Sequence, residues 1–292
     1  MISTTHHSHS AHLTGVVLVI ISAVVFSSAG IFTKGVEANA WDVIFWRGVF
    51  AALFTTGYIT WRGSLRNDFL NMGYPGLAAA VIGASGTAAF LSSFKLTTVA
   101  NVALLFASAP LLAIAFAWLW FRERPTKASL VACFAAMIGV AIIVSASIGA
   151  PSLKGDLLAL WMTIAMAFFF VIYRRYPDTP AAGPNVLSCI ILTVPCLLLS
   201  NPFQVPFNEL VILAAFGLVF AIASVTLTEG AKRIPAGETA LLSILETPLA
   251  PVLAWIILAE LPTSATLIGG FIILIAVIGS QLPNLKSNRK GF

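Results

Sequence analysis

Long apolar runs dominate this sequence and leave few folds open to it. Ten of them follow one another with short polar connections, and each can form about 17–25 residues of helix, enough to cross a bilayer. The runs are continuously apolar and do not alternate with polar residues, which favours helices over a membrane barrel. We expect helices at Leu13–Thr33, Asp42–Trp61, Gly73–Ser93, Val99–Phe121, Ala128–Ile148, Asp156–Tyr173, Pro184–Ser200, Leu210–Thr228, Gly237–Leu258 and Ser264–Leu282.

The composition indicates that the folded chain is surrounded by lipid and not by water. Hydrophobic residues make up 59% of the 292 residues and charged residues 9%, whereas an ordinary soluble domain has roughly 25% charged residues. The net charge of +5 does not indicate nucleic acid, because the sixteen basic residues are scattered between apolar runs and form no stripe. The three cysteines lie inside apolar runs, so we interpret them as packing residues and predict neither disulfide nor metal site.

One segment of the sequence occurs twice. Residues 100–126 align without a gap to residues 237–263, and ten of the twenty-seven pairs are identical. Both copies have central prolines and end in Glu-x-Pro-Thr, and the first and sixth runs share a Leu-x-Gly start at residues 13–15 and 153–155. A repeat of membrane-length segments with central prolines is typical of a transporter built from two similar halves.

Basic residues predict the orientation of the chain in the membrane. With the N-terminus in the cytoplasm, twelve basic residues fall on internal segments and three on external ones: Arg62, Arg66, Arg122, Arg124, Lys127, Arg174, Arg175, Lys232, Arg233, Lys286, Arg289 and Lys290 against Lys34, Lys95 and Lys154. Each half has five spans, an odd number, so the second half must insert upside down relative to the first.

The sequence therefore predicts an all-α integral membrane protein of ten transmembrane helices in two inverted five-helix repeats. The expected divisions are a cytoplasmic tail at 1–12, the first repeat at 13–148, the second at 149–283 and a second cytoplasmic tail at 284–292. The first tail holds all four histidines. They can bind a metal loosely or simply be solvated, and nothing else in the chain supplies metal ligands.

The central prolines are the first candidates for a binding site. Pro110 cannot donate to the carbonyl four residues back, and Pro248 and Pro251 repeat the defect in the other half. A freed carbonyl in a bilayer must face protein or a water-filled cavity. We therefore expect the fourth and ninth spans to bend and face a shared cavity, with simple packing kinks as the alternative.

Two charged residues lie well inside spans, away from the span ends. Glu246 is the carboxylate deepest in a span, where a charge costs about 2.5–3.5 kcal/mol, so it can bind a substrate amine, carry a proton, or be protonated and hydrogen-bonded to a neighbouring helix. Arg47 can extend outward to the interface or attract a substrate carboxylate. Phe106, Ser108 and Ser243 flank the breaks and either line the pocket or belong to the core.

Taken together, these residues resemble the EamA-like family of ten-helix drug/metabolite transporters. The resemblance rests on Ser27-Ser28-Ala29-Gly30 with Lys34, on Phe45-Trp46-Arg47-Gly48, on Phe94-Lys95, and on the segments Pro110 to Glu123 and Pro248 to Glu260. One position departs from the family: a glutamate often directly precedes the ninth-span proline, whereas here Thr247 separates Glu246 from Pro248. This turns the carboxylate by about 100° around a helix.

The resemblance implies a bacterial inner-membrane exporter of amino acids or similar small metabolites, working by alternating access around a central cavity, with both termini cytoplasmic. Its implied partners are a small-molecule substrate and the lipid bilayer, with no cofactor and no nucleic acid; the sequence leaves the oligomeric state open. A drug or nucleotide-sugar exchanger, a membrane enzyme acting on lipids and a structural membrane subunit are the alternatives. The Gly83-x-Ser85-Gly86 sequence does not support a serine protease, which needs a buried histidine base.

Overall fold

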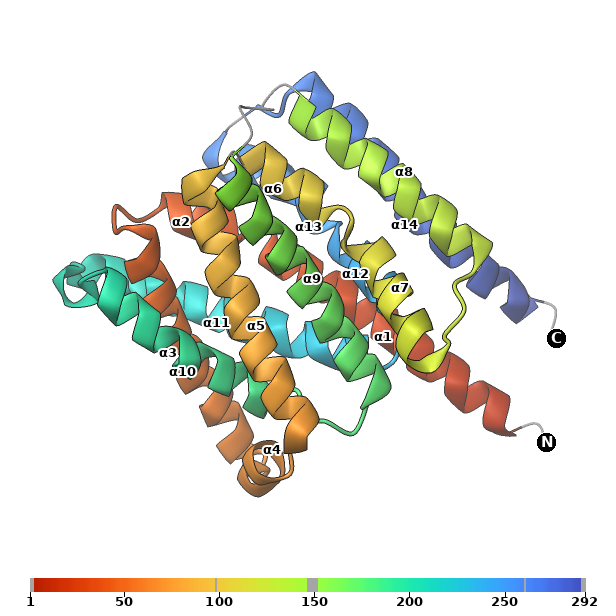
Figure 1. Cartoon of the computed structure of the whole chain (residues 1–292), viewed down its shortest axis with the longest axis horizontal. Helices are drawn as coiled ribbons and strands as arrows, with labels where there is room; N and C mark the ends of the chain where they lie inside the picture. The colour runs from red at the N-terminus through yellow and green to blue at the C-terminus, as the bar shows by residue number, and fades with distance from the viewer. Residues whose placement is uncertain (1–2, 98, 146–151, 260, 290–292) are drawn as a thin grey trace.

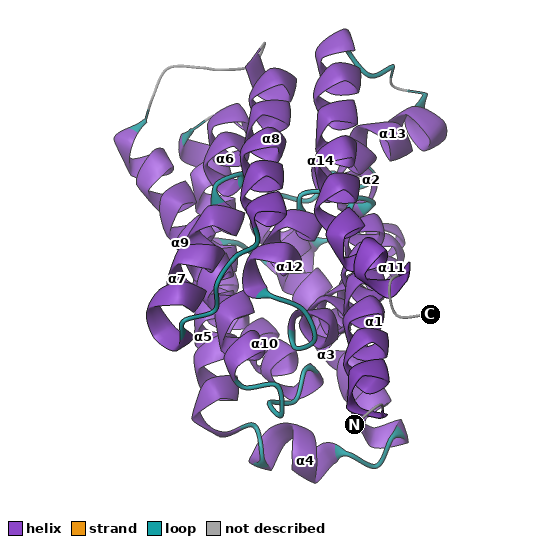
Figure 2. Ribbon diagram, turned by 90° about the vertical axis from the view of Figure 1, so that its right-hand side faces the viewer, coloured by secondary structure: helices purple, strands orange, loops and turns teal. Residues whose placement is uncertain are grey.

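The structure is a computed structural model that describes residues 3–97, 99–145, 152–259 and 261–289. Every element formed by these residues is a helix (Figures 1 and 2). The helices are α1 (Ser3–Phe26), α2 (Ala29–Lys34), α3 (Ala40–Trp61), α4 (Leu65–Leu70), α5 (Gly73–Leu96), α6 (Val99–Phe106), α7 (Ala109–Phe121), α8 (Lys127–Val144), α9 (Leu153–Arg175), α10 (Ala182–Leu199), η2 (Pro202–Gln204), α11 (Phe207–Ala231), α12 (Ala236–Ser243), α13 (Glu246–Leu258) and α14 (Ser264–Arg289).

Where the structure describes them, the ten expected spans are formed by helices, three of them by two helices in succession. Within the described residues, nine helical segments are long and apolar enough to cross a membrane. The remaining expected span is α5, a helix of 24 residues that packs against α9 and α10. Large apolar side chains point outward from the bundle, with Leu198 80% and Ile256 71% exposed, as a lipid-facing surface requires. The prediction of an all-α integral membrane fold is confirmed. The expected boundary between residues 148 and 149, and Glu260 of the repeat, lie outside the described residues.

Three spans are interrupted near their middle. The fourth span breaks at Ala107–Ser108 between α6 and α7, and the ninth at Ile244–Leu245 between α12 and α13. Each break lies just before a proline, as the missing proline N–H requires. The first span breaks at Ser27–Ser28, although it contains no proline, whereas the equivalent sixth span is the continuous helix α9.

Helix packing follows the inverted repeat. In the repeat, α1 is equivalent to α9, α3 to α10 and α5 to α11. The α1–α11 contact is therefore equivalent to the α9–α5 contact, and the α3–α11 contact to the α10–α5 contact, and all four pairs pack closely. The α3–α10 and α8–α14 pairs each join equivalent spans, and Figure 1 shows α8 and α14 running side by side. The two halves are therefore joined through equivalent surfaces.

Two glycines show the repeat at atomic detail and explain the Leu-x-Gly sequence. A Cβ on Gly15 would lie 2.8 Å from Arg233 Cβ and from Ile234 Cγ2. A Cβ on Gly155 would lie 2.7 Å from Cβ of Thr97 and 2.8 Å from its nitrogen. Thr97 and Ile234 are equivalent in the aligned repeat. Each half thus uses a glycine at the start of its first span to let the other half approach.

The basic end of the bundle, as used below, is the end formed by the turns at residues 62–72, 122–126, 176–181 and 232–235. These turns carry most of the arginines in the connections. The opposite end is formed by the connections at residues 35–39 and 200–206, together with the end of α5 and the start of α6.

Candidate functional site

Serines occupy or adjoin all three helix breaks, and their hydroxyls bond within their own helices. Ser27 Oγ donates to the Val24 carbonyl at 2.6 Å, and Ser108 Oγ donates to the Leu105 carbonyl at 2.6 Å. The buried Ser243 Oγ donates to the Thr239 carbonyl at 2.9 Å. These bonds use the hydroxyl hydrogens but leave oxygen lone pairs able to accept a hydrogen bond.

The two predicted prolines face different neighbours. Pro110 is buried in the first turn of α7 and faces α12, where a Cβ on Gly237 would lie 3.5 Å from the Pro110 carbonyl oxygen. Pro248 packs on α14, where a Cβ on Gly270 would lie 3.0 Å from Pro248 Cβ. Residues of both breaks, Ala107, Ile244 and Leu245, are buried in the large hydrophobic core of the bundle.

Phe106 ends α6 and lies half-buried beside a small hydrophobic cluster. It packs with α5 and α9 through Ala89, Ala159 and Met162. These contacts are those of a packing residue.

Glu246 opens α13 directly after the ninth-span break. Its side chain is half-buried, and among the described residues its carboxylate has neither a hydrogen-bond donor nor an ion-pair partner. Helix α13 packs against α1 and α2, so this carboxylate comes from an element that adjoins the break at Ser27–Ser28. An unpaired carboxylate inside the bundle is free to bind a cationic group or a proton.

Arg47 is held by aromatic rings inside the bundle. Its Cζ lies 4.2 Å from the ring centre of Phe220 and 5.5 Å from that of Phe216, both on α11. Its Nε is buried without a hydrogen-bond partner, and no described carboxylate pairs with the guanidinium. Cation–π contacts of this kind are worth about 2 kcal/mol or more when desolvated. They offset part of the cost of burial but leave the N–H donors available.

A chain of contacts connects Arg47 to the breaks. The Phe220 ring packs edge-on against Phe26, with centroids 5.6 Å apart, and Phe26 is the last residue of α1 before its break. Helix α2, which follows that break, contacts both α11 and α13. Helix α2 thus connects α11, which carries the aromatic residues around Arg47, to α13, which begins with Glu246.

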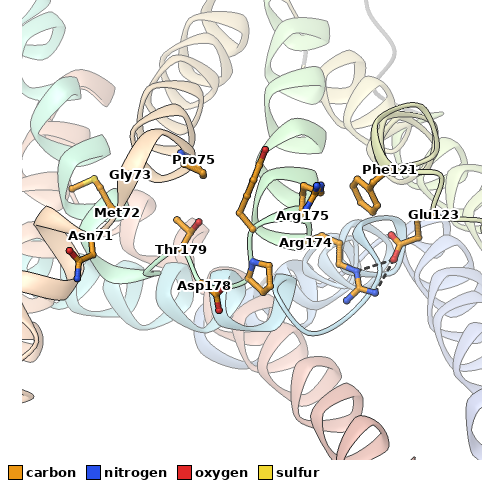
Figure 3. A pocket seen from close by; sticks show the side chains of 12 residues that line it. Asn71, Met72, Gly73, Pro75, Phe121, Glu123, Arg174, Arg175, Asp178 and Thr179 are labelled. Carbon is orange, nitrogen blue, oxygen red and sulfur yellow. Dashed lines mark hydrogen bonds and ion pairs between the residues drawn. The ribbon is translucent and has the colours of Figure 1, made fainter.

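The basic end holds a second group of polar residues, which are not among the predicted site residues. Arg174 on α9 binds Glu123 through Nε and Nη2, each 2.9 Å from Oε1, as Figure 3 shows. This pair lines a pocket of about 740 Å³ that also includes Arg175, Asp178 and Thr179. Glu123 carried a signal that could have found it, because it is one of the residues identical in both repeats.

His12 and Glu238 form another contact at this end. His12 Nε2 lies 3.1 Å from Glu238 Oε2, joining α1 to the start of α12. The sequence predicts a polar tail at residues 1–12, whereas α1 begins at Ser3 and contains His12. Both side chains line a pocket of about 210 Å³, together with Glu123, Arg124 and other residues. Glu238 Oε1 is buried without a hydrogen-bond partner.

The two ends of the bundle differ in how closely the halves pack. Leu241 and Leu242 in α12 are fully buried, whereas their identical repeat equivalents in α6 are not: Leu104 is 38% exposed and Leu105 half-buried. Helix α12 packs on α7, and among the described residues α6 does not pack comparably on α13. The halves are thus closer together at the basic end than at the opposite end.

Comparisons with known proteins agree with this architecture. The sequence matches the EamA-like transporter family over residues 13–145 and again over residues 153–281. A solved structure titled "Crystal structure of protein" superposes with a TM-score of 0.81 at 20% identity, covering 94% of this chain and 98% of the other. At that identity the likeness shows the fold alone. No match was found among curated proteins.

Proposed function

This chain belongs to the EamA-like transporter family, and we propose that it exports amino acids or similar small metabolites across a bacterial inner membrane. The basic end faces the cytoplasm in this proposal, because basic connections are retained on that side. Transport proceeds by alternating access: the two halves part at one end of the bundle and then at the other. With this orientation, close packing of the halves at the basic end corresponds to a state closed towards the cytoplasm.

The observation that carries the amino-acid assignment is a pair of opposite interior charges without described partners. A charge within a membrane span costs about 2.5–3.5 kcal/mol on insertion scales, so such residues usually have a partner or a function. Glu246 fits a substrate ammonium, and Arg47 fits a substrate carboxylate, which a guanidinium binds with two parallel hydrogen bonds. An α-amino acid carries both groups.

The aromatic residues beside Arg47 suggest which side chains the site favours. Phe26, Phe216 and Phe220 form an apolar wall within this region. Aromatic faces stabilise apolar and aromatic groups through area burial and ring packing. We therefore expect aromatic and large aliphatic amino acids to be carried better than small polar ones.

The test is transport by the purified protein in liposomes. Three versions of one amino acid are compared: the free form, its amide, which lacks the carboxylate, and its N-acetyl form, which lacks the ammonium. The wild type should prefer the free form. Glu246→Gln should lose the preference over the N-acetyl form, and Arg47→Gln the preference over the amide. Glu37→Gln is the matched control, because Glu37 is exposed between α2 and α3.

The outcome also separates the alternatives. If wild-type protein moves no amino acid but exchanges a nucleotide sugar or a cationic drug, the substrate class is wrong while the transporter assignment stands. If both charge variants keep the wild-type preference for the free amino acid, Glu246 and Arg47 have structural roles only.

A further inference from the structure

We infer that His12 and Glu238 form a protonation site that latches the basic end closed, so that opening of this end responds to the pH on its own side of the membrane. The inference rests on the proposed alternating-access function but not on the identity of the substrate. It adds a regulatory ligand, the proton, and assigns it to two residues outside the region of Glu246 and Arg47.

The position of the pair makes it a connection between the two halves. His12 lies on α1 of the first half and Glu238 on α12 of the second, 226 residues apart. Helix α12 is buried along its whole length and packs on α7, α9 and α1. Of these neighbours, α7 and α1 belong to the first half and α9 belongs to the same half as α12, so separating the halves at the basic end requires α12 to leave α7 and α1. The His12–Glu238 contact has to break if α1 stays with its own half.

The chemistry of the pair makes the closed state depend on one proton. When the pair holds a proton, either an imidazolium faces a carboxylate or a neutral imidazole faces a carboxylic acid, and the buried group carries no net charge. Without that proton, Glu238 keeps a buried carboxylate whose Oε1 has no hydrogen-bond partner and whose neighbour is a neutral ring. A buried charge without a partner is costly. Opening relieves that cost by exposing the carboxylate to water.

Other charged groups near the pair are already bound to each other or lie in the pocket. Arg174 on α9 acts on His12 electrostatically, but its guanidinium is bound to Glu123. Arg124 lies in the turn before α8 and lines the same pocket. At the end of α11, Glu229 bonds to Lys232 at 2.8 Å and to Arg233 at 2.7 Å. The described part of α14 contributes Ser280 to the pocket. Among these groups, His12 is the one whose ordinary titration falls between pH 5 and 8.

The repeat supplies an internal comparison, because the equivalent place at the opposite end is built without histidine. Glu238 aligns with Asn101, and His12 with Ser152 in the alignment of the two Leu-x-Gly starts. There, Thr97 Oγ1 donates to Asp156 Oδ1 at 2.8 Å, and Asn101 Nδ2 donates to Thr97 Oγ1 at 3.1 Å. An amide and a hydroxyl do not titrate in the physiological range. The described cluster contains a carboxylate, Asp156, but no imidazole, so a response around the ordinary histidine value is expected from the basic end.

The sign of the effect follows from linkage. The closed state is stabilised while the pair holds its proton, at pH values below the ordinary histidine value of about 6.5, and that stabilisation is lost as the pH rises. Because one proton is involved, the ratio of closed to open molecules falls by at most about tenfold per pH unit. The pocket of about 210 Å³ lets protons reach the pair from the basic end.

The experiment measures the distance between the halves at the basic end with spin labels. The labels are placed on exposed Lys127, in the first half, and exposed Asp178, in the second, in full-length protein whose three buried cysteines are replaced. Between pH 5.5 and 8, the wild-type pair should change from mainly short to increasingly long distances. His12→Gln and Glu238→Gln should each give a distribution that no longer depends on pH.

Two controls keep the test decisive even if one variant folds poorly. Glu123→Gln leaves the pair but removes the counter-charge of Arg174, whose positive charge disfavours a proton on His12, so the pH response should remain but move to lower pH. The exchanged variant, His12→Glu with Glu238→His, should recover a pH response that the single variants lack. A wild-type distribution that stays flat from pH 5.5 to 8, or a response that persists in both single variants, overturns the inference. The distance measurement needs no substrate, so the pH-dependent latch can still be tested if the protein carries no amino acid. If the protein carries amino acids but the distance distribution does not change with pH, the latch is rejected and the transport proposal stands.

Discussion

Gly237→Ala should open the basic end. Gly237 is the second residue of α12, and a Cβ there would lie 2.2 Å from Ile114 Cγ1 and 2.9 Å from Ile114 Cδ1 on α7. Ordinary carbon–carbon contacts are about 3.5–4.0 Å, so the methyl group and the isoleucine must separate by more than 1 Å. Ile114 Cγ1 is bonded to Cβ and so lies close to the backbone of α7. This atom therefore cannot move far from the new methyl group unless the helix itself shifts.

The magnitude follows from the cost of overpacking. Extra methyl groups in a packed interior typically cost about 1–3 kcal/mol, and here the cost falls on the closed state, in which α7 and α12 touch. The higher helix propensity of alanine applies to both states and cancels from their ratio. The ratio of closed to open molecules should therefore fall by roughly 5- to 150-fold.

The spin-label pair at Lys127 and Asp178 reports this ratio directly. Gly237→Ala should increase the long-distance population at every pH, in contrast to the His12 variants, which change its pH dependence. Adding Ile114→Ala removes the clashing atoms and should restore a large part of the short-distance population. If Gly237→Ala keeps the wild-type distances, or if Ile114→Ala fails to reverse its effect, the contact between α7 and α12 does not control closure.

Three further predictions concern packing, the site and the topology. Gly269→Ala should lower the melting temperature in detergent, because its Cβ meets the Gly139 carbonyl oxygen on α8, whereas Gly279→Ala, with open space around it, should not. Arg47→Lys keeps the charge but loses the planar fork, so the KM for an amino acid measured in liposomes should rise about tenfold, a loss of about 1.4 kcal/mol in binding; an unchanged KM would exclude a bidentate carboxylate contact. A reporter fused after Phe292 and active only in the periplasm should stay silent, and strong activity would refute the orientation.

The spans and two of the three breaks could be predicted because their causes are local. Apolar runs of membrane length form helices whatever their neighbours are, and a proline lacks the N–H that its helix needs. The break at Ser27–Ser28 has a weaker local cause. The hydroxyls of these serines donate to the Val24 and Val25 carbonyls, which competes with the helical bonds. Serines do this in many continuous helices as well, so the sequence alone does not separate the two outcomes.

The candidate site could be predicted by residue type but not by partner. A charged residue within an apolar run is visible in the sequence, which is why Glu246 and Arg47 were selected. That Arg47 stacks on Phe220, 173 residues later, is a tertiary contact with no local pattern. The His12–Glu238 pair was missed for the same reason, and because neighbouring histidines make residues 1–12 look like a solvated tail.

The repeat predicts which surfaces of the two halves meet, but it does not predict which end of the bundle is closed. The difference between the two ends comes from the residues that the two copies do not share. Glycine at 237 lets α12 lie against Ile114, whereas the equivalent residues in the other half are Ala100 and Pro251. Glu238 has a histidine partner, whereas Asn101 bonds to a threonine and an aspartate. Two closures built from different contacts have different free energies, so one of them is preferred in the absence of substrate. Identical leucines, fully buried in α12 and partly exposed in α6, are the structural result. A transporter with two perfectly identical halves would have no such preference, and its resting state would be set by the membrane and the substrate alone.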